Sequence, residues 1–140
     1  MEKSIFMLKP EAMNHKEEIL SYIEKGGLKI IRFRTMTLTE DELRKIYHDT
    51  HGPLWEKTKE HFLGKEVLVA EVEDENAIEN LKKICGTKTD PAVCEIDSVR
   101  NMFKDLSERD IFKYHKNIIH RAMDKKEVDD QTIIFFPERK

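Results

Sequence analysis

The stretch "VLVAEVEDENAIENLKKICG", Val67 to Gly86, places a strand directly before a helix. Its first six residues are apolar except for one glutamate and are rich in valine, which is typical of a strand. After a short charged turn, apolar side chains recur at helical spacing as far as Gly86, at Ala77, Ile78, Leu81, Ile84 and Cys85. The stretch therefore predicts a strand and a helix in succession.

The same order of strand and helix occurs at the N-terminus. "SIFML", residues 4–8, is a short apolar run of the buried-strand type. In the helix that follows, Asn14 is a candidate cap with Glu17 three residues later, and Gly26-Gly27 ends the helix. "LKIIRFRTMTL", residues 28–38, is rich in β-branched side chains and predicts a long second strand.

Two further helices and a last strand complete the pattern. Thr39 and Glu42 have the spacing of a capping box at the start of one helix. Pro53 begins another helical stretch that runs to about Phe62, so the two pieces predict a helical hairpin. "IIFF", residues 133–136, is predicted to be the fourth strand.

This order of elements predicts an α+β fold of the ferredoxin-like type. In that βαββαβ sandwich, helices cover one face of a four-stranded antiparallel sheet. The whole chain, residues 1–140, is expected to form a single domain, because a chain of this length builds one core. The weakly patterned region from Gly86 to about Asn117 is interpreted as a functional loop. Since this fold hosts many functions, function must be argued from a site.

The charge of the chain is nearly balanced: 25 Lys and Arg against 28 Asp and Glu leave a formal net charge of −3. This balance offers no general field for nucleic acid or for a membrane, so neither is expected as a partner. No apolar run could span a membrane, and the N-terminal run is too short and too charged for a signal peptide, which predicts a cytoplasmic protein. Cys85 and Cys94 are expected to be reduced and inert, and no Cys or His spacing matches a metal site.

Several side chains could hold or move a phosphoryl group, although none forms a motif alone. Lys9 ends the first strand, Arg100 follows a candidate helix cap and Thr89 lies in a turn. Taken alone, each is more typical of an ordinary surface or turn residue. His120, in "KNIIHRAMD" (residues 116–124), follows two isoleucines that predict a packed backbone and a fixed imidazole. It is either a structural histidine or a nucleophile. Because no glycine-rich phosphate loop and no hydrolase or kinase motif occurs, phosphate chemistry would depend on side chains.

Five short segments, in order along the chain, are similar to the motifs of one enzyme family. "FMLKPEA" is similar to a strand ending in Lys-Pro-Asp-Gly, and "IYHDTHGPLW" to a Tyr-containing helix and Pro-Phe-Phe turn. "GTKTDPA", "SVR" and "NIIHRAMD" are similar to Gly-x-Thr-Asn-Pro-Ala, Thr-Ile-Arg and Asn-x-x-His-Gly-Ser-Asp. Together they resemble the nucleoside diphosphate kinase family over nearly the whole chain, as a divergent member.

The resemblance implies a phosphotransferase. His120 would take the γ-phosphoryl group of a nucleoside triphosphate such as ATP and pass it to a nucleoside diphosphate in a ping-pong mechanism. Lys9 would contact the ribose hydroxyls and the phosphate in transfer, and Tyr47 would lie beside the histidine. Mg²⁺ would bridge the nucleotide phosphates with little protein ligation. The remaining nucleotide-binding residues implied are Leu54, Lys82, Thr89, Arg100 and Asn117.

The sequence departs from the family pattern next to the histidine. The family's Gly-Ser-Asp becomes Arg121, Ala122 and Met123, so a hydroxyl donor is missing. The glutamate that orients the histidine ring is matched by Gln131, which can accept a hydrogen bond but supplies no charge. By analogy with oxyanion-hole deletions, losing such a donor costs about ten- to a thousandfold in rate.

Other departures lie further from the histidine. Lys82 replaces an arginine and loses its fork geometry. Leu54 replaces the aromatic residue that stacks on the base, and Trp55 either takes the second aromatic place or belongs to the core. Glu11-Ala12 replaces Asp-Gly after Lys-Pro, and residues 104–116 contain extra residues relative to the family.

Three interpretations of function remain open. The first is an active nucleoside diphosphate kinase of reduced rate; the second is a nucleotide-binding or regulatory protein of the same fold without turnover. The third, an RNA-binding domain, needs exposed aromatic and basic side chains on central strands, which neither "VLVAEV" nor "IIFF" supplies. Retention of Lys9, Arg100, Asn117 and His120 together favours the first. The resemblance also implies a homo-oligomer, whether hexamer, tetramer or dimer.

Overall fold

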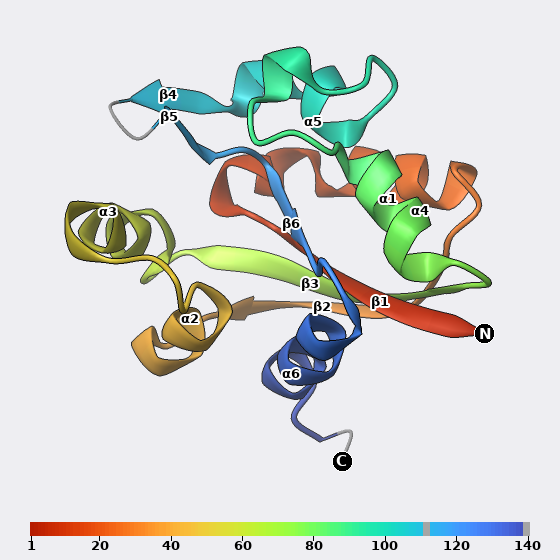
Figure 1. Ribbon diagram of the computed structural model, residues 1–140, viewed down its shortest axis with the longest axis horizontal. Helices are drawn as coiled ribbons and strands as arrows, with labels where there is room; N and C mark the ends of the chain where they lie inside the picture. The colour runs from red at the N-terminus through yellow and green to blue at the C-terminus, as the bar shows by residue number, and fades with distance from the viewer. Residues whose placement is uncertain (111–112, 139–140) are drawn as a thin grey trace.

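The computed structural model describes residues 1–110 and 113–138. Its centre is a four-stranded antiparallel sheet with the strand order β2-β3-β1-β6. The three N-terminal strands lie where they were predicted, and the ferredoxin-like order of the sheet is confirmed (Figure 1). The strands are β1 (Glu2–Leu8), β2 (Lys29–Thr37), β3 (Glu66–Asp74) and β6 (Ile119–Arg121).

Helices cover both faces of this sheet, whereas the sequence predicted helices on one face. Helices α1 (Lys16–Lys25) and α4 (Ala77–Cys85) pack on the face that carries Phe6 and Leu8 of β1. Helices α2 (Glu40–Ile46) and α6 (Lys125–Phe135) pack on the opposite face, with Ile5 and Met7 (Figure 1). Because alternate residues of a strand point to opposite faces, a run that is apolar throughout requires a cover on each side.

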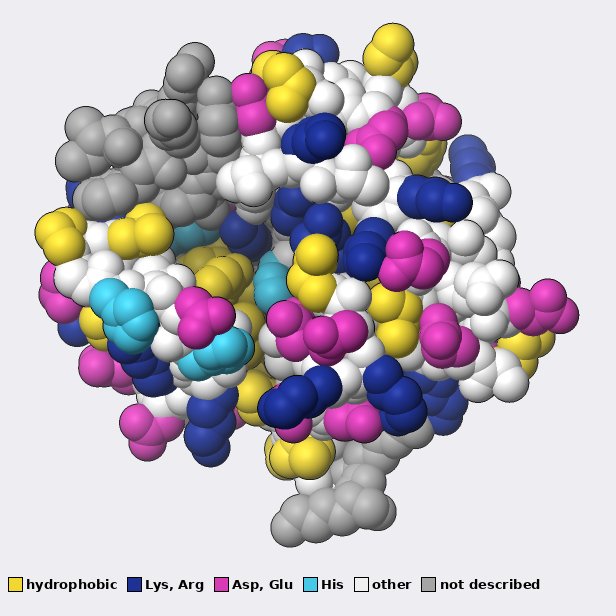
Figure 2. Space-filling view, in the orientation of Figure 1, with side chains coloured by type: hydrophobic (Ala, Val, Ile, Leu, Met, Phe, Trp, Pro, Cys, Tyr) yellow, Lys and Arg dark blue, Asp and Glu magenta, His cyan; other side chains and the backbone are white. Residues whose placement is uncertain are grey.

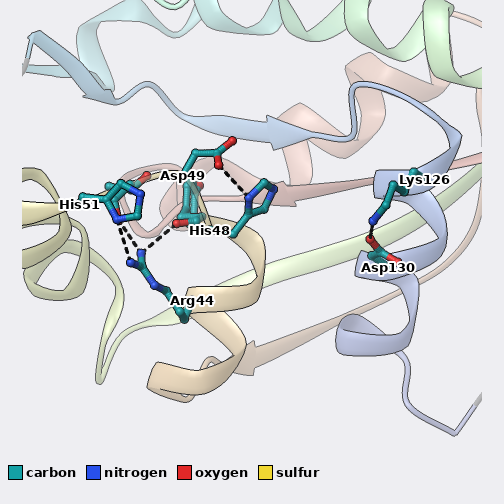
Figure 3. A network of polar contacts seen from close by, with 8 residues as sticks. Arg44, His48, Asp49, His51, Lys126 and Asp130 are labelled. Carbon is teal, nitrogen blue, oxygen red and sulfur yellow. Dashed lines mark hydrogen bonds and ion pairs between the residues drawn. The ribbon is translucent and has the colours of Figure 1, made fainter.

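The fourth strand is not "IIFF". Residues 133–136 end helix α6, which Asp124 caps by accepting a hydrogen bond from the Glu127 amide. Two ion pairs at i,i+4 spacing support this helix, one of them between Lys126 and Asp130 (Figure 3). The strand beside β1 is instead β6, which carries His120. A short apolar run has the same composition in a buried helix end as in a strand, so the pattern alone misassigned it.

The predicted capping box is confirmed, and the predicted Asn14 cap is wrong. The Thr39 hydroxyl accepts from the Glu42 amide, and the Glu42 carboxylate accepts from the Thr39 amide. Near the N-terminus, a 3-10 helix, η1 (Pro10–His15), runs directly into α1, so Asn14 lies inside a helical turn. Helix α3 (Gly52–Phe62) follows α2 and has Pro53 in its first turn, in keeping with the prediction that Pro53 marks its start.

The region from 86 to 117 contains several short elements. They are η2 (Pro91–Val93), α5 (Val99–Met102), η3 (Lys104–Leu106), and the paired strands β4 (Glu108–Asp110) and β5 (Lys113–Lys116). Two positions of the inserted stretch, 111 and 112, lie outside the described residues. Within the described part of the chain, no helix is long and apolar enough to cross a membrane.

Candidate functional site

One cavity of about 250 Å³ gathers most of the residues singled out in the sequence. Figure 2 shows a hollow near the centre of one face, with histidine and Lys or Arg side chains beside it. A larger hollow, of about 600 Å³, lies between the start of β1 and helix α6 and contains none of them. The cavity is lined by the predicted residues Lys9, Tyr47, Leu54, Thr89, Arg100, Asn117 and His120, together with Thr50, Thr58, His61 and Phe62.

Strand β6 positions His120 on the α6 face of the sheet. His120 pairs with Met7 of β1, so its side chain points to the face that Met7 occupies. There its Nε2 atom lies 2.7 Å from Oε1 of Gln131, a buried residue of α6. The Tyr47 ring packs beside the imidazole, with 5.6 Å between ring centroids.

The contact with Gln131 decides which nitrogen of His120 carries the proton. A carbonyl oxygen only accepts, so Nε2 carries the proton and Nδ1 keeps its lone pair. Burial lowers the pKa of His120 to about 3; the Gln131 bond opposes this change, while the charges of Lys9, Arg121 and Arg100 add to it. The imidazole is therefore neutral at pH 7, as nucleophilic attack requires.

Lys9 connects the first strand to the segment before His120. Its Nζ atom donates to Oδ1 of Asn117 at 2.6 Å, and Asn117 donates to the Thr89 carbonyl at 3.1 Å. Three predicted residues from distant parts of the sequence thus share one chain of hydrogen bonds. Burial lowers the pKa of Lys9 to about 7; the negative charge of Glu11 opposes this, whereas Arg100 and Arg121 reinforce it.

Two buried guanidinium groups stand next to the cavity. Arg100 donates to the carbonyls of Lys88 and Ile119, each at 2.8 Å, and shares the Gly86 carbonyl with Arg121. The lack of a side chain at Gly86 lets Arg100 and Cys94 lie close to its backbone. A Cβ atom at this position would lie only 3.2 Å from Cβ of Arg100 and 2.9 Å from Sγ of Cys94. No carboxylate among the described residues pairs with either arginine, so the site stays cationic.

Polar groups of two residues that line the cavity lack protein partners among the described residues. They are the buried Tyr47 hydroxyl and Nε of Arg100. Buried polar groups usually have a partner, and leaving one unsatisfied costs about 1–3 kcal/mol. Both are therefore available to a polar ligand.

Arg44 holds the turn that brings Tyr47 and Thr50 to the cavity. It donates to the carbonyls of both residues and contacts Nδ1 of His51 (Figure 3). Its guanidinium lies 4.4 Å from the centroid of the Trp55 ring. Trp55 packs against the core on the α6 side, and its ring lies against the Arg44 guanidinium. It does not line the cavity.

Two predicted residues do not line the cavity. Lys82, on α4, pairs with Glu79 at 2.9 Å and donates to the Met123 carbonyl at 3.3 Å. Gln131 lies behind His120 and reaches the cavity only through it.

Several residues of the site were not predicted from the sequence. Thr58, His61 and Phe62 follow Leu54 at spacings of four, seven and eight residues, which is one face of helix α3 and could have identified them. Glu11 was noted only as a departure from the family pattern, yet its carboxylate contacts His61.

The described residues contain no group of three or more His, Cys, Asp or Glu side chains that could hold a metal ion. Cys85 and Cys94 are free and buried, and burial raises the pKa of Cys85 to about 12, which keeps its thiol protonated. Cys85 is therefore not poised to act as a thiolate.

Comparison with known proteins identifies similar chains. The family model for nucleoside diphosphate kinase matches residues 2–140. A nucleoside diphosphate kinase of Wolbachia pipientis subsp. Culex pipiens is 31% identical, over 99% of this chain and 96% of its own length. That of Methanocaldococcus jannaschii is 29% identical, over 98% and 94% respectively.

Solved structures share the fold. The apo crystal structure of nucleoside diphosphate kinase from Encephalitozoon cuniculi has a TM-score of 0.82 at 21% identity, covering 97% of this chain and 89% of that one. A transition state mimic of the Borrelia burgdorferi enzyme, with bound vanadate and ADP, has a TM-score of 0.78 at 21% identity, covering 96% and 86%.

Proposed function

The chain belongs to the nucleoside diphosphate kinase family, and we propose that it is an active phosphotransferase that moves a γ-phosphoryl group between nucleotides through His120. The observation that carries the proposal is the state of His120. It is neutral, held through Nε2 by Gln131, and surrounded by the charges of Lys9, Arg100 and Arg121. A fixed neutral imidazole beside cations suits attack on an anionic phosphate.

The reaction would take place in two matched steps. The Nδ1 lone pair forms a bond to the γ-phosphorus of a nucleoside triphosphate, the bond to the bridging oxygen breaks, and the diphosphate leaves. A terminal oxygen of a second nucleoside diphosphate then attacks the phosphohistidine, the N–P bond breaks, and a new triphosphate leaves. Lys9 and Arg100 would stabilise negative charge on the phosphate oxygens.

Nucleotide-bound Mg²⁺ fits this site. It would neutralise charge on the phosphates when bound. Glu11 is the carboxylate next to Lys9, and both of its oxygens already accept hydrogen bonds from His61 and from the Ile118 amide. The nucleotide phosphates, rather than a protein carboxylate, would therefore hold the ion.

Base recognition would rest on Leu54 and Thr58 of α3. They line the cavity one helical turn apart, and the Thr58 hydroxyl is already bonded to the Leu54 carbonyl at 2.8 Å. An apolar contact without base-edge readout is consistent with ATP and other nucleoside di- and triphosphates as substrates. Nucleotide substrates also support a cytoplasmic location.

A second candidate, a nucleotide-binding protein without turnover, is favoured by one pair of observations. The methyl group of Ala122 is fully buried and donates no hydrogen bond, and Gln131 gives the imidazole no negative charge. The RNA-binding interpretation is less well supported, because the central strands β1 and β3 are packed on both faces. We also propose a homo-oligomer, whose size sedimentation would measure.

Labelling with γ-³²P ATP and Mg²⁺, followed by a GDP chase, separates the two candidates. An active kinase gives an acid-labile, base-stable phosphoenzyme whose label moves to GDP, and the His120→Ala variant gives none. Nucleotide binding without labelling would instead support the second candidate.

A further inference from the structure

The backbone two residues before His120 is strained. Ile118 has φ of +84° and is the only non-glycine residue in the described chain with a positive φ. The Ile119 amide donates to the Asn117 carbonyl at 3.0 Å, so Ile118 is the central residue of a three-residue γ-turn. A β-branched residue in this region costs about 1–3 kcal/mol, and such strain persists only where the surroundings enforce it.

The amide and the carbonyl of Ile118 are both hydrogen-bonded to residues of the segment that follows β1. Glu11, in η1, accepts a hydrogen bond from the Ile118 amide at its Oε2, over 2.9 Å. The Lys9 amide donates to the Ile118 carbonyl, also over 2.9 Å. The turn is thus anchored by one backbone group and one carboxylate.

The second oxygen of that carboxylate is held by helix α3. Nε2 of His61 donates to Oε1 of Glu11 over 2.6 Å. His61 is 3% exposed, lines the cavity, and packs against Phe62 with 4.5 Å between ring centroids. Its ring therefore has little freedom to leave the carboxylate.

The charge of Glu11 suits this role. Burial by itself raises the pKa of Glu11, but the His61 hydrogen bond and the positive charges of His61 and Lys9 outweigh burial and lower it. The carboxylate is therefore ionised at neutral pH, and both of its oxygens can accept.

We propose that His61 and Glu11 form a positioning pair for the phosphotransfer proposed above: they hold Ile118 in its strained turn and so set the directions of Asn117 and His120. Asn117 is the first residue of the turn and binds Lys9, whereas His120 directly follows the turn. A rotation of the Ile118 peptide would therefore move the proposed nucleophile relative to the lysine. The pair acts through the backbone and does not touch the reacting atoms.

The first test compares two substitutions of His61. His61→Gln keeps an N–H donor near the position of Nε2, whereas His61→Phe keeps a ring but donates nothing. At saturating ATP, the phenylalanine variant is expected to phosphorylate His120 about tenfold to a hundredfold more slowly, with little change in nucleotide affinity. The glutamine variant should recover most of the rate. Equal rates in the two variants would overturn the proposal.

The second test asks whether Glu11 acts through Ile118. Glu11→Gln leaves one carbonyl acceptor for two donors, so the phosphorylation rate should fall. The matched control is Glu2→Gln, whose carbonyl can still accept its single hydrogen bond from the Ile78 amide, so its rate should stay unchanged. In an Ile118→Gly background the turn is no longer strained, so Glu11→Gln should slow phosphorylation much less than it does in the wild-type background. Equal costs in both backgrounds would contradict the proposal. If the glycine substitution unfolds the chain, the His61 comparison decides.

A readout that does not need activity separates this proposal from the proposed function. Hydrogen exchange of the Ile118 amide should accelerate in Glu11→Gln and His61→Phe but not in Glu2→Gln. Failure of wild-type protein to accept label refutes the kinase, whereas an unchanged Ile118 amide in both variants refutes the positioning pair.

Discussion

The Nε2 atom of His120 lies 2.7 Å from the Oε1 atom of Gln131, and this bond joins strand β6 to helix α6. It fixes the ring and its tautomer without placing a negative charge beside it. If the imidazole receives a phosphoryl group, as proposed, both of its nitrogens are substituted. An anionic partner would then stabilise the ring more than a neutral amide does.

Gln131→Glu is therefore expected to accelerate phosphorylation of His120 by about tenfold, with an accompanying rise in the pKa of His120. Gln131→Leu, which cannot accept, should slow it about tenfold or more. Rapid-quench measurement of phosphoenzyme at saturating ATP gives both rates. A faster leucine variant would show that the bond restrains His120 rather than positioning it.

The pH dependence of phosphorylation should follow Lys9. Since the pKa of Lys9 is lowered to about 7, its charge is lost as pH rises through 7 in the free protein. His120 has a pKa of about 3 and stays neutral throughout this range. The value of kcat/KM should thus decline above pH 7, and Lys9→Arg should remove the decline, because arginine keeps its charge. If kcat/KM of the Lys9→Arg variant still declined above pH 7, a group other than Lys9 would cause the decline.

Acid should destabilise the fold partly through His120. Its folded pKa, about 3, lies below the unfolded value of 6.5, so the unfolded chain binds more protons between these limits. Stability is therefore lost as pH falls from 6.5 toward 3, by about 2 kcal/mol at pH 5. In urea titrations at pH 7 and pH 5, His120→Gln should lose less stability than wild type. Equal losses would show that His120 is exposed enough to protonate in the fold.

Leu54→Phe should tighten nucleotide binding. A phenylalanine at this cavity wall could stack on a base, which adds about 0.5–1.5 kcal/mol beyond area burial, or roughly threefold to tenfold in Kd. Calorimetry with ADP and GDP should show similar gains, because every base has a stacking face. A gain for one base alone would indicate edge recognition instead.

Arg121→Met should raise the pKa of His120, because the charge of Arg121 contributes to lowering it. Titration of the His120 ring nitrogens by ¹⁵N NMR measures this directly. Lys125→Met is the matched control, since Lys125 is exposed and pairs with Asp129. An identical His120 pKa in both variants would show that the Arg121 charge is screened from the imidazole.

Several features were determined by the sequence alone because they depend on neighbouring residues. The Thr39–Glu42 box, the strand at 67–72 and the helix that Gly86 ends are local patterns, and each was predicted correctly. The motifs also selected most of the residues that line the cavity, because their types and order are printed in the chain.

Only the tertiary structure decided the rest. It assigned the fourth strand to 119–121 rather than 133–136, because a three-residue strand is recognised by its pairing with β1, whereas an apolar run fits a helix end equally well. It placed Lys82 against Glu79 and outside the cavity, since the direction of a long side chain depends on its partners. It also joined His61 to Glu11 across fifty residues, and strained turns enforced by such distant contacts leave no local signal in the sequence.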